Sequence, residues 1–148
     1  VRSAKFGFKA EPGRSIVGPA GALLSRVTFT KNNGEKKFVV TDAGMNDLLR
    51  PPLYGAHHPI LTVKQNGSVN EGLADIVGPI CESSDFLGKG RHLGHVGRGD
   101  LLAVMNAGAY GFAMSSNYNG RLRPAELLVD GKAVRLIRHR QTYDALLN

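Results

Sequence analysis

Two runs of β-branched and aromatic residues, Arg26-Val27-Thr28-Phe29-Thr30 and Lys37-Phe38-Val39-Val40-Thr41, lie on either side of Asn32-Asn33-Gly34. An Asn-Gly pair between two such runs is a strong short-range signal for a β-hairpin. The stretch therefore predicts two antiparallel strands that are joined by a tight turn near Gly34.

The same pattern continues along the chain, where short apolar runs alternate with turn residues. Nineteen glycines and seven prolines divide the 148 residues into short pieces. A second hairpin is expected where Asp130-Gly131 separates residues 126–129 from residues 133–137. Further strands are predicted at residues 60–63, 74–80 and, after a Gly99-Asp100 turn, 101–105. Many short strands with tight turns indicate a mainly β fold, a Greek-key β-sandwich or barrel.

Helical signals are few. Residues 16–24 follow a Gly13-Arg14-Ser15 turn and are expected to form a helix. Residues 46–50 are expected to form a single turn that Pro51-Pro52 stops. Thr142 is expected to cap a short terminal helix that runs through residue 147.

Composition limits the class of protein. A hydrophobic fraction of 42% and a charged fraction of 21% are those of an ordinary globular domain. The single cysteine excludes a disulfide framework and a zinc site of paired cysteines, and it fits a reducing compartment. No apolar run approaches the ~20 residues that span a bilayer, and the first residues lack the apolar stretch of a signal peptide. A cytoplasmic location without membrane contact is therefore expected.

The formal net charge of +7 comes mostly from scattered Lys and Arg residues that acidic residues accompany. This distribution favours anionic small molecules or an acidic partner segment over nucleic acid. We expect no nucleic-acid partner.

Several motif-like segments are not interpreted as sites. Residues 88–94 resemble a glycine-rich phosphate loop, but the spacing is wrong and no helix pattern follows, which favours a mobile surface loop. His92 and His95 have a spacing known from metal sites but lack an evident third ligand. His57 and His58 are adjacent and precede Pro59. We expect no metal site and place all four histidines in solvated loops.

Four segments contain side chains that could bind a ligand or take part in a reaction. Cys81-Glu82 lies in an acidic turn at the end of an apolar run, although a free cysteine taken alone is more often a small buried hydrophobe. Glu11-Pro12-Gly13-Arg14 could bring backbone N–H groups and a guanidinium to an anion, or be an ordinary turn. Arg50 and Tyr54 on a proline-braced turn could bind a carboxylate from two sides, or be structural. Tyr110 among small residues could face a ligand, or fill a gap in the core.

These segments together resemble the C-terminal region of meso-diaminopimelate decarboxylase, a pyridoxal-phosphate enzyme of the alanine racemase and ornithine decarboxylase fold. The resemblance covers nearly everything from Glu11 onward. Its blocks are Glu11-Pro-Gly-Arg-Ser-Ile-Val-Gly18, Asp42-Ala-Gly-Met-Asn-Asp-Leu-Leu-Arg50 with Leu53-Tyr54-Gly55, Gly78-Pro-Ile-Cys-Glu-Ser83 with Asp85, Gly99-Asp-Leu-Leu-Ala-Val-Met-Asn-Ala-Gly-Ala-Tyr-Gly111, Ser116-Asn-Tyr-Asn119 and Arg123-Pro-Ala-Glu126.

The resemblance implies a role for each matched residue. Glu11, Pro12, Gly13 and Arg14 would line the phosphate of pyridoxal 5′-phosphate, and Arg14 would also reach a substrate carboxylate. Arg50 and Tyr54 would bind the carboxylate at the far end of the substrate, and Glu82 its distal ammonium. Tyr110 would contact both cofactor and substrate. Cys81 would donate a proton after carbon dioxide leaves, in the active site of the neighbouring subunit of a homodimer with shared sites.

The implied activity is that of a lyase in lysine biosynthesis, a carboxy-lyase that converts meso-2,6-diaminopimelate to L-lysine and CO2. A thiol in water has a pKa of about 8.5 and is mostly protonated at neutral pH, so a cysteine can serve as the acid. Glutamate after the cysteine favours diaminopimelate, since ornithine decarboxylases of this fold carry aspartate there.

The Schiff-base lysine of such enzymes belongs to an N-terminal (β/α)8 barrel, which 148 residues cannot hold in addition to this domain. We therefore expect a truncated or internally deleted chain, inactive alone. Residues 1–24 would be a βα remnant of the cofactor-binding barrel, and residues 25–148 the C-terminal β domain. Two alternatives are a non-catalytic dimerisation or regulatory module, and an ornithine or arginine decarboxylase of the same fold.

Overall fold

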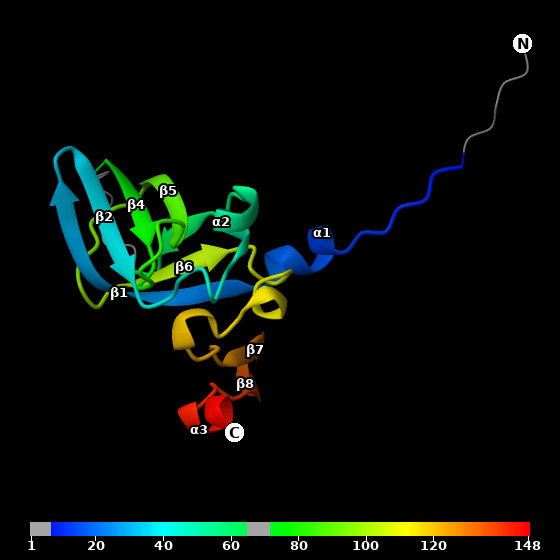
Figure 1. Cartoon of the computed structure of the whole chain (residues 1–148). Helices are drawn as coiled ribbons and strands as arrows, with labels where there is room; N and C mark the ends of the chain where they lie inside the picture. The colour runs from blue at the N-terminus through cyan, green and yellow to red at the C-terminus, as the bar shows by residue number, and fades with distance from the viewer. Residues whose placement is uncertain (1–6, 65–71) are drawn as a thin grey trace, which may run out of the picture.

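The computed structural model describes residues 7–64 and 72–148. Six strands form one sheet in the order β3-β6-β1-β2-β4-β5, and two more form a separate ribbon, β7-β8. The sheet curls on itself (Figure 1), which confirms the mainly β prediction. The strands are β1 (Ala22–Asn33), β2 (Lys36–Thr41), β3 (Ile60–Thr62), β4 (Leu73–Val77), β5 (Phe86–His92), β6 (Leu101–Met105), β7 (Glu126–Asp130) and β8 (Ala133–Arg138).

The long strand β1 joins the two parts of the sheet. Its first half pairs antiparallel with β6 at residues 22–26, and its second half pairs antiparallel with β2 at residues 27–33. The register shifts between Val27 and Phe29, and such an irregularity bends a strand and increases its twist. One strand can therefore belong to both parts while the sheet curls.

Both predicted hairpins are present, and the turn of the second lies one residue later than the expected Asp130-Gly131. The loop residues are Gly34-Glu35 between Asn33 and Lys36, and Gly131-Lys132 between Asp130 and Ala133. Gly34 and Gly131 have φ of +61° and +58°. Glycine therefore occupies the first loop position, where a two-residue hairpin turn requires a positive φ.

The core lies on the inner face of the curled sheet. Leu48, Ile76, Leu87 and Leu102 are fully buried, and each such side chain contributes about 1.5–3 kcal/mol through burial. The other buried members of the cluster are Val27, Val39, Ala43, Ile60, Ala74, Leu93, Val96 and Val104.

The helices are α1 (Arg14–Val17), η1 (Gly18–Ala20), α2 (Arg50–Tyr54), η2 (Phe112–Met114), η3 (Tyr118–Gly120) and α3 (Tyr143–Leu147). The predicted cap of the last helix is confirmed, because the hydroxyl of Thr142 accepts a hydrogen bond from the backbone N–H of Ala145 at 3.2 Å. None of the helices among the described residues is long and apolar enough to cross a membrane.

Three expectations about local structure are wrong. Residues 22–24 begin β1 instead of continuing a helix from residue 16, because their backbones pair with β6. Pro51 and Pro52 lie inside α2 instead of ending a turn before it, since proline is tolerated in a first turn, whose N–H groups lack helical acceptors. Residues 88–92 belong to β5 instead of a mobile loop, because they pair with β4.

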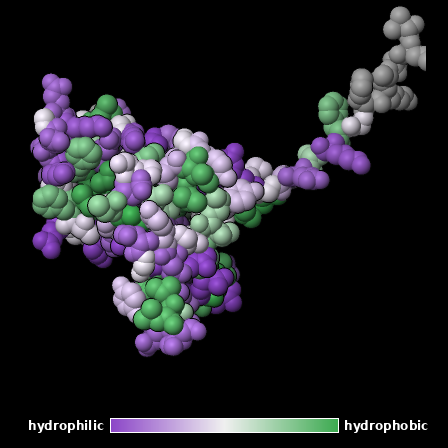
Figure 2. All heavy atoms as spheres, viewed as in Figure 1, coloured by the Kyte–Doolittle hydropathy of each residue, from purple (hydrophilic) through white to green (hydrophobic). Residues whose placement is uncertain are grey.

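The ribbon β7-β8 exposes apolar side chains. Leu127 pairs with Leu136 and Val129 with Val134, and all four are exposed. Apolar atoms accordingly reach the surface of the lobe that holds the ribbon and α3 (Figure 2).

Aromatic and polar contacts attach the ribbon to the rest of the molecule. The guanidinium of Arg138 in β8 lies 4.4 Å from the centroid of the Phe112 ring, and that of Arg123 lies 4.3 Å from it. Both distances fall in the range of cation–π attraction.

The expected division of the chain at residue 24 falls inside β1, which begins at Ala22. Residues 7–13 extend away from the sheet (Figure 1). The assignment of residues 1–24 to a barrel remnant stays a prediction, and residues 1–6 of that segment lie outside the described residues.

Candidate functional site

Arg50 lies between two tyrosine rings. Its Cζ atom is 5.6 Å from the ring centroid of Tyr54 and 5.4 Å from that of Tyr110. Arg50 and Tyr54 are the first and last residues of α2 and therefore lie about one helical turn apart. Tyr110 comes from a loop 60 residues further along the chain. We call Arg50, Tyr54 and Tyr110 the aromatic clamp.

The loop that carries Tyr110 has an unusual backbone. Asn106 and Tyr110 both have φ of +60°, a conformation that costs energy for a residue other than glycine. Tyr110 is 48% exposed, so it does not fill a gap in the core, which was the alternative interpretation of its small neighbours. The backbone holds its ring at the surface beside Arg50.

Close backbone contact fixes this loop to the segment after α1. The N–H of Ala107 donates to Gly21 O at 2.8 Å, and the N–H of Gly108 donates to Gly18 O at 3.1 Å. A Cβ atom on Gly108 would lie 2.0 Å from Val17 O. Only glycine permits this approach, and it brings the helix of Arg14 beside the loop of Tyr110.

The predicted phosphate-binding turn lies at the start of α1. Glu11, Pro12 and Gly13 are exposed, and Gly13 O accepts hydrogen bonds from the N–H groups of Ile16 and Val17. The charges of Arg14 and Arg50 both lower the pKa of His58. Two guanidinium groups and two phenols suit a phosphate or carboxylate ligand.

His58 is a further member of this region, and the expectation that it lies in a solvated loop is wrong. It is 4% exposed, and its Nδ1 lies 2.9 Å from Met105 O. Burial lowers the pKa of His58, and the charges of Arg50, His57 and Arg14 lower it further. The ring is therefore neutral at physiological pH. His57 and His95 are exposed outside the helices and strands, as expected, whereas His92 is exposed but is the last residue of β5 and not part of a loop.

Cys81 and Glu82 lie on a different loop, residues 78–85, which we call the cysteine loop. Cys81 is exposed, so it is not the small buried hydrophobe that most free cysteines are. The buried carboxylate of Asp85 organises the loop by accepting hydrogen bonds from the N–H groups of Ile80 and Met45, each at 2.6 Å. Asp85 therefore also fixes the cysteine loop to residues 44–47.

Local hydrogen bonds hold the Glu82 carboxylate. Its Oε1 accepts from the Ser84 hydroxyl at 2.9 Å and from the Ser84 N–H at 3.3 Å. The Tyr118 hydroxyl lies 3.5 Å from its Oε2. The bonds from Ser84 lower the pKa of Glu82. Glu82 is thus an exposed anion in a defined position.

The predicted residues form two groups. One contains Arg14 and the aromatic clamp, and the other contains Cys81 and Glu82. Within the part of the chain that the structure describes, no recorded hydrogen bond, ion pair or ring contact links the groups. Sequence reasoning missed His58, Ser84 and Tyr118 as residues that support the site. The adjacency of His58 to the Arg50-Tyr54 segment was the one available signal.

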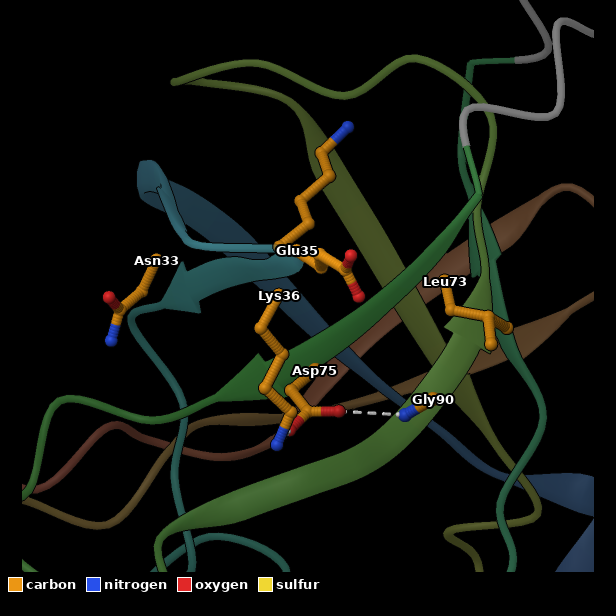
Figure 3. Close-up of a pocket in the computed structure, with 7 residues that line it drawn as sticks. Asn33, Glu35, Lys36, Leu73, Asp75 and Gly90 are labelled. Atoms are coloured by element: carbon orange, nitrogen blue, oxygen red, sulfur yellow. Dashed lines mark hydrogen bonds and ion pairs between the residues drawn. The ribbon is translucent and has the colours of Figure 1, made fainter.

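Two hollows among the described residues differ in character. One, of about 500 Å³, lies beside the first hairpin and contains the Lys36–Asp75 ion pair (Figure 3), with 3.0 Å between Nζ and Oδ2. Asp75 also accepts a hydrogen bond from Gly90 N–H at 2.8 Å, so its carboxylate has partners within this lining. The other, of about 240 Å³, lies between Leu49, next to Arg50, and Tyr118, next to Glu82. Only the second adjoins predicted site residues.

A family model described as pyridoxal-dependent decarboxylase, C-terminal sheet domain, matches residues 15–108. The chain belongs to this family. The match includes Arg50, Tyr54, Cys81 and Glu82, and Tyr110 follows it by two residues. The resemblance noted from the sequence blocks is therefore confirmed.

Named relatives agree with this decarboxylase family. A diaminopimelate decarboxylase from Aquifex aeolicus is 54% identical over 137 residues, which are 93% of this chain and 32% of the relative. Diaminopimelate decarboxylase from Helicobacter pylori complexed with L-lysine has a TM-score of 0.84 at 45% identity, over 92% of this chain and 33% of that one.

A lysine/ornithine decarboxylase from Vibrio vulnificus complexed with cadaverine is less similar to this sheet domain. Its TM-score is 0.66 at 27% identity, over 76% of this chain and 31% of that one. The present chain spans about a third of the length of the curated relatives that it matches.

Proposed function

We propose that this chain is the C-terminal sheet domain of a decarboxylase that converts meso-2,6-diaminopimelate to L-lysine and CO2. The observation that carries the proposal is the aromatic clamp, in which Arg50 is held between Tyr54 and Tyr110 beside the helix of Arg14. The match to diaminopimelate decarboxylases across nearly the whole chain supports it.

The cations of the site suit the two kinds of anion that the reaction presents. Arg14 and the exposed turn at residues 11–13 would bind the phosphate of pyridoxal 5′-phosphate, and the Tyr110 ring would contact the cofactor and the substrate. Arg50 and Tyr54 would bind the distal carboxylate of the substrate, since a guanidinium and a phenol can donate to its two oxygens. Arg50 then fixes the end of the substrate that does not react.

Bound pyridoxal 5′-phosphate would supply the electron sink for breaking the bond to the departing carboxylate. The donor set of Arg14 and Tyr110 fits its phosphate and ring. The residues of this chain would orient the substrate and donate a proton. Cys81 is exposed and able to reach a ligand outside its own loop. Its thiol would donate the proton from Sγ to the carbon that loses CO2.

The arrangement in two groups supports a site that is shared by two subunits. Cys81 and Glu82 lie on the cysteine loop, whereas Arg50 and Tyr110 lie in the aromatic clamp. We propose that the cysteine loop of one subunit faces the aromatic clamp of the other in a homodimer. Glu82 would then bind the distal ammonium of the substrate, while Arg50 binds the distal carboxylate. This pairing selects a substrate with a complete amino-acid group at its far end over ornithine or lysine.

The test uses the full-length protein that contains this chain, loaded with pyridoxal 5′-phosphate. We expect release of CO2 and L-lysine from meso-diaminopimelate, with ornithine and arginine as poor substrates. The 148-residue chain alone should be inactive, because it spans about a third of its relatives and provides only part of the site. Faster turnover of ornithine would favour the alternative decarboxylase, and no turnover of any of these amino acids would favour a non-catalytic module. The proposal places the activity in the cytoplasm.

A further inference from the structure

His58 lies between the two parts of the aromatic clamp. It follows α2, which carries Arg50 and Tyr54, by four residues. Its Nδ1 is 2.9 Å from the carbonyl oxygen of Met105, and Met105 is the last residue of β6. The loop with Tyr110 begins at the next residue. His58 thus connects the segment after α2 to the origin of that loop.

A second bond at the same place completes the connection. The N–H of Met105 donates to the carbonyl oxygen of Pro59 at 2.8 Å. Both backbone polar groups of Met105 are therefore hydrogen-bonded: its N–H donates to the Pro59 carbonyl, and its carbonyl accepts from the His58 ring. The side-chain bond is the one that a substitution can remove without altering the backbone.

The acceptor determines which nitrogen of His58 carries the proton. A carbonyl oxygen can only accept, so Nδ1 must donate. The charged and titratable groups that act on His58 are Arg50 on α2, Arg14 on α1 and the neighbouring His57, and together with burial they lower the pKa of the ring. His58 is accordingly neutral, with hydrogen on Nδ1.

We propose that His58 is a positioning residue, which holds the loop of Tyr110 in register with Arg50 through the hydrogen bond from its Nδ1–H to Met105 O. It does not contact the reacting atoms in this account. The structural part of the proposal depends only on the aromatic clamp, and its catalytic consequence rests on the proposed function.

The first measurement requires no substitution. Nitrogen-15 NMR of the imidazole rings in this chain should show His58 neutral at pH 7, with hydrogen on Nδ1. A His58 ring that carries hydrogen on Nε2, or that is protonated at pH 7, would overturn the proposal.

The second measurement compares two variants of nearly equal size. His58→Asn keeps a donor near the position of Nδ1, and His58→Leu removes it. His58→Leu should speed amide hydrogen exchange of Ala107 and Gly108 by about tenfold, because the partly buried carbonyl of Met105 loses its donor. His58→Asn and the control His57→Asn should stay within about twofold of the parent. Equal exchange in both His58 variants would contradict the proposal.

The catalytic arm uses the full-length enzyme. His58→Leu should lower kcat/KM for diaminopimelate, and His58→Asn should restore most of the loss. If the parent enzyme does not act on diaminopimelate, the proposed function fails while the exchange result still decides the role of His58. If the parent is active and both variants match it, the positioning role in catalysis is wrong.

Discussion

Replacing Asp85 by asparagine tests how the cysteine loop is held. The two carboxylate oxygens of Asp85 each accept one backbone N–H, from Met45 and from Ile80, at 2.6 Å. Gly44 and Gly78 allow the carboxylate to lie against the backbone, since a Cβ at either position would come within 2.6 Å of its oxygens. Asparagine has nearly the same shape but offers only one oxygen.

The expected loss of stability follows from these two bonds. Losing one hydrogen bond to a charged acceptor costs about 1.5–3 kcal/mol, and an amide donor facing an unpaired N–H adds about 1–3 kcal/mol. Allowing for local relaxation, we expect Asp85→Asn to lower the free energy of unfolding by about 3 kcal/mol. Such a loss corresponds to a decrease in Tm of roughly 6–12 °C for a chain of this size.

The assay is denaturant unfolding of the parent, Asp85→Asn and the control Asp130→Asn. Asp130 is exposed at the end of β7, so its substitution should change stability by less than about 0.5 kcal/mol. The reasoning fails if Asp85→Asn costs less than about 1 kcal/mol, because the two bonds would then not hold the loop.

The remaining predictions concern the close backbone contact and the Glu82 carboxylate. Gly108→Ala places a Cβ 2.0 Å from Val17 O and should destabilise the chain by about 3 kcal/mol or more, whereas Gly97→Ala, with open space around it, should be nearly neutral in the same unfolding assay. Ser84→Ala should raise the pKa of Glu82, since the hydrogen bond from the Ser84 hydroxyl is the largest cause that lowers it. Because the folded-state pKa lies below the usual value, the contribution of Glu82 to stability is present above that value and is lost as pH falls through the folded-state pKa. An unchanged NMR titration of Glu82 in Ser84→Ala would contradict this attribution.

Local sequence signals predicted those elements whose determinants lie within a few residues. The glycine turns of both hairpins and the Thr142 cap act within a few residues, so the sequence contains the relevant chemistry. Strand β5 was missed because Gly88 and Gly90 interrupt any alternation of apolar and polar residues. This segment forms a strand because it pairs with β4, although its own residues have little strand propensity.

The features of the site that could not be predicted from the sequence depend on long-range contacts. The sequence blocks that resemble the decarboxylase family identified Arg50, Tyr110 and Cys81 as site residues. They did not show that Arg50 lies between two tyrosine rings, or that Asp85 organises the cysteine loop. The role of His58 depends on a carbonyl 47 residues away, which no local pattern reveals. Pairing of β1 with both β2 and β6 brings these segments together.

A subunit-mixing experiment tests the shared site most directly. Full-length Cys81→Ala and Arg50→Ala variants would be inactive separately and then be mixed and allowed to exchange subunits. If Cys81 of one subunit completes the clamp of the other, half of the dimers are mixed and each has one intact site, so activity should return to about a quarter of the parent value. If both residues act within one chain, no intact site can form, and the mixture will remain inactive.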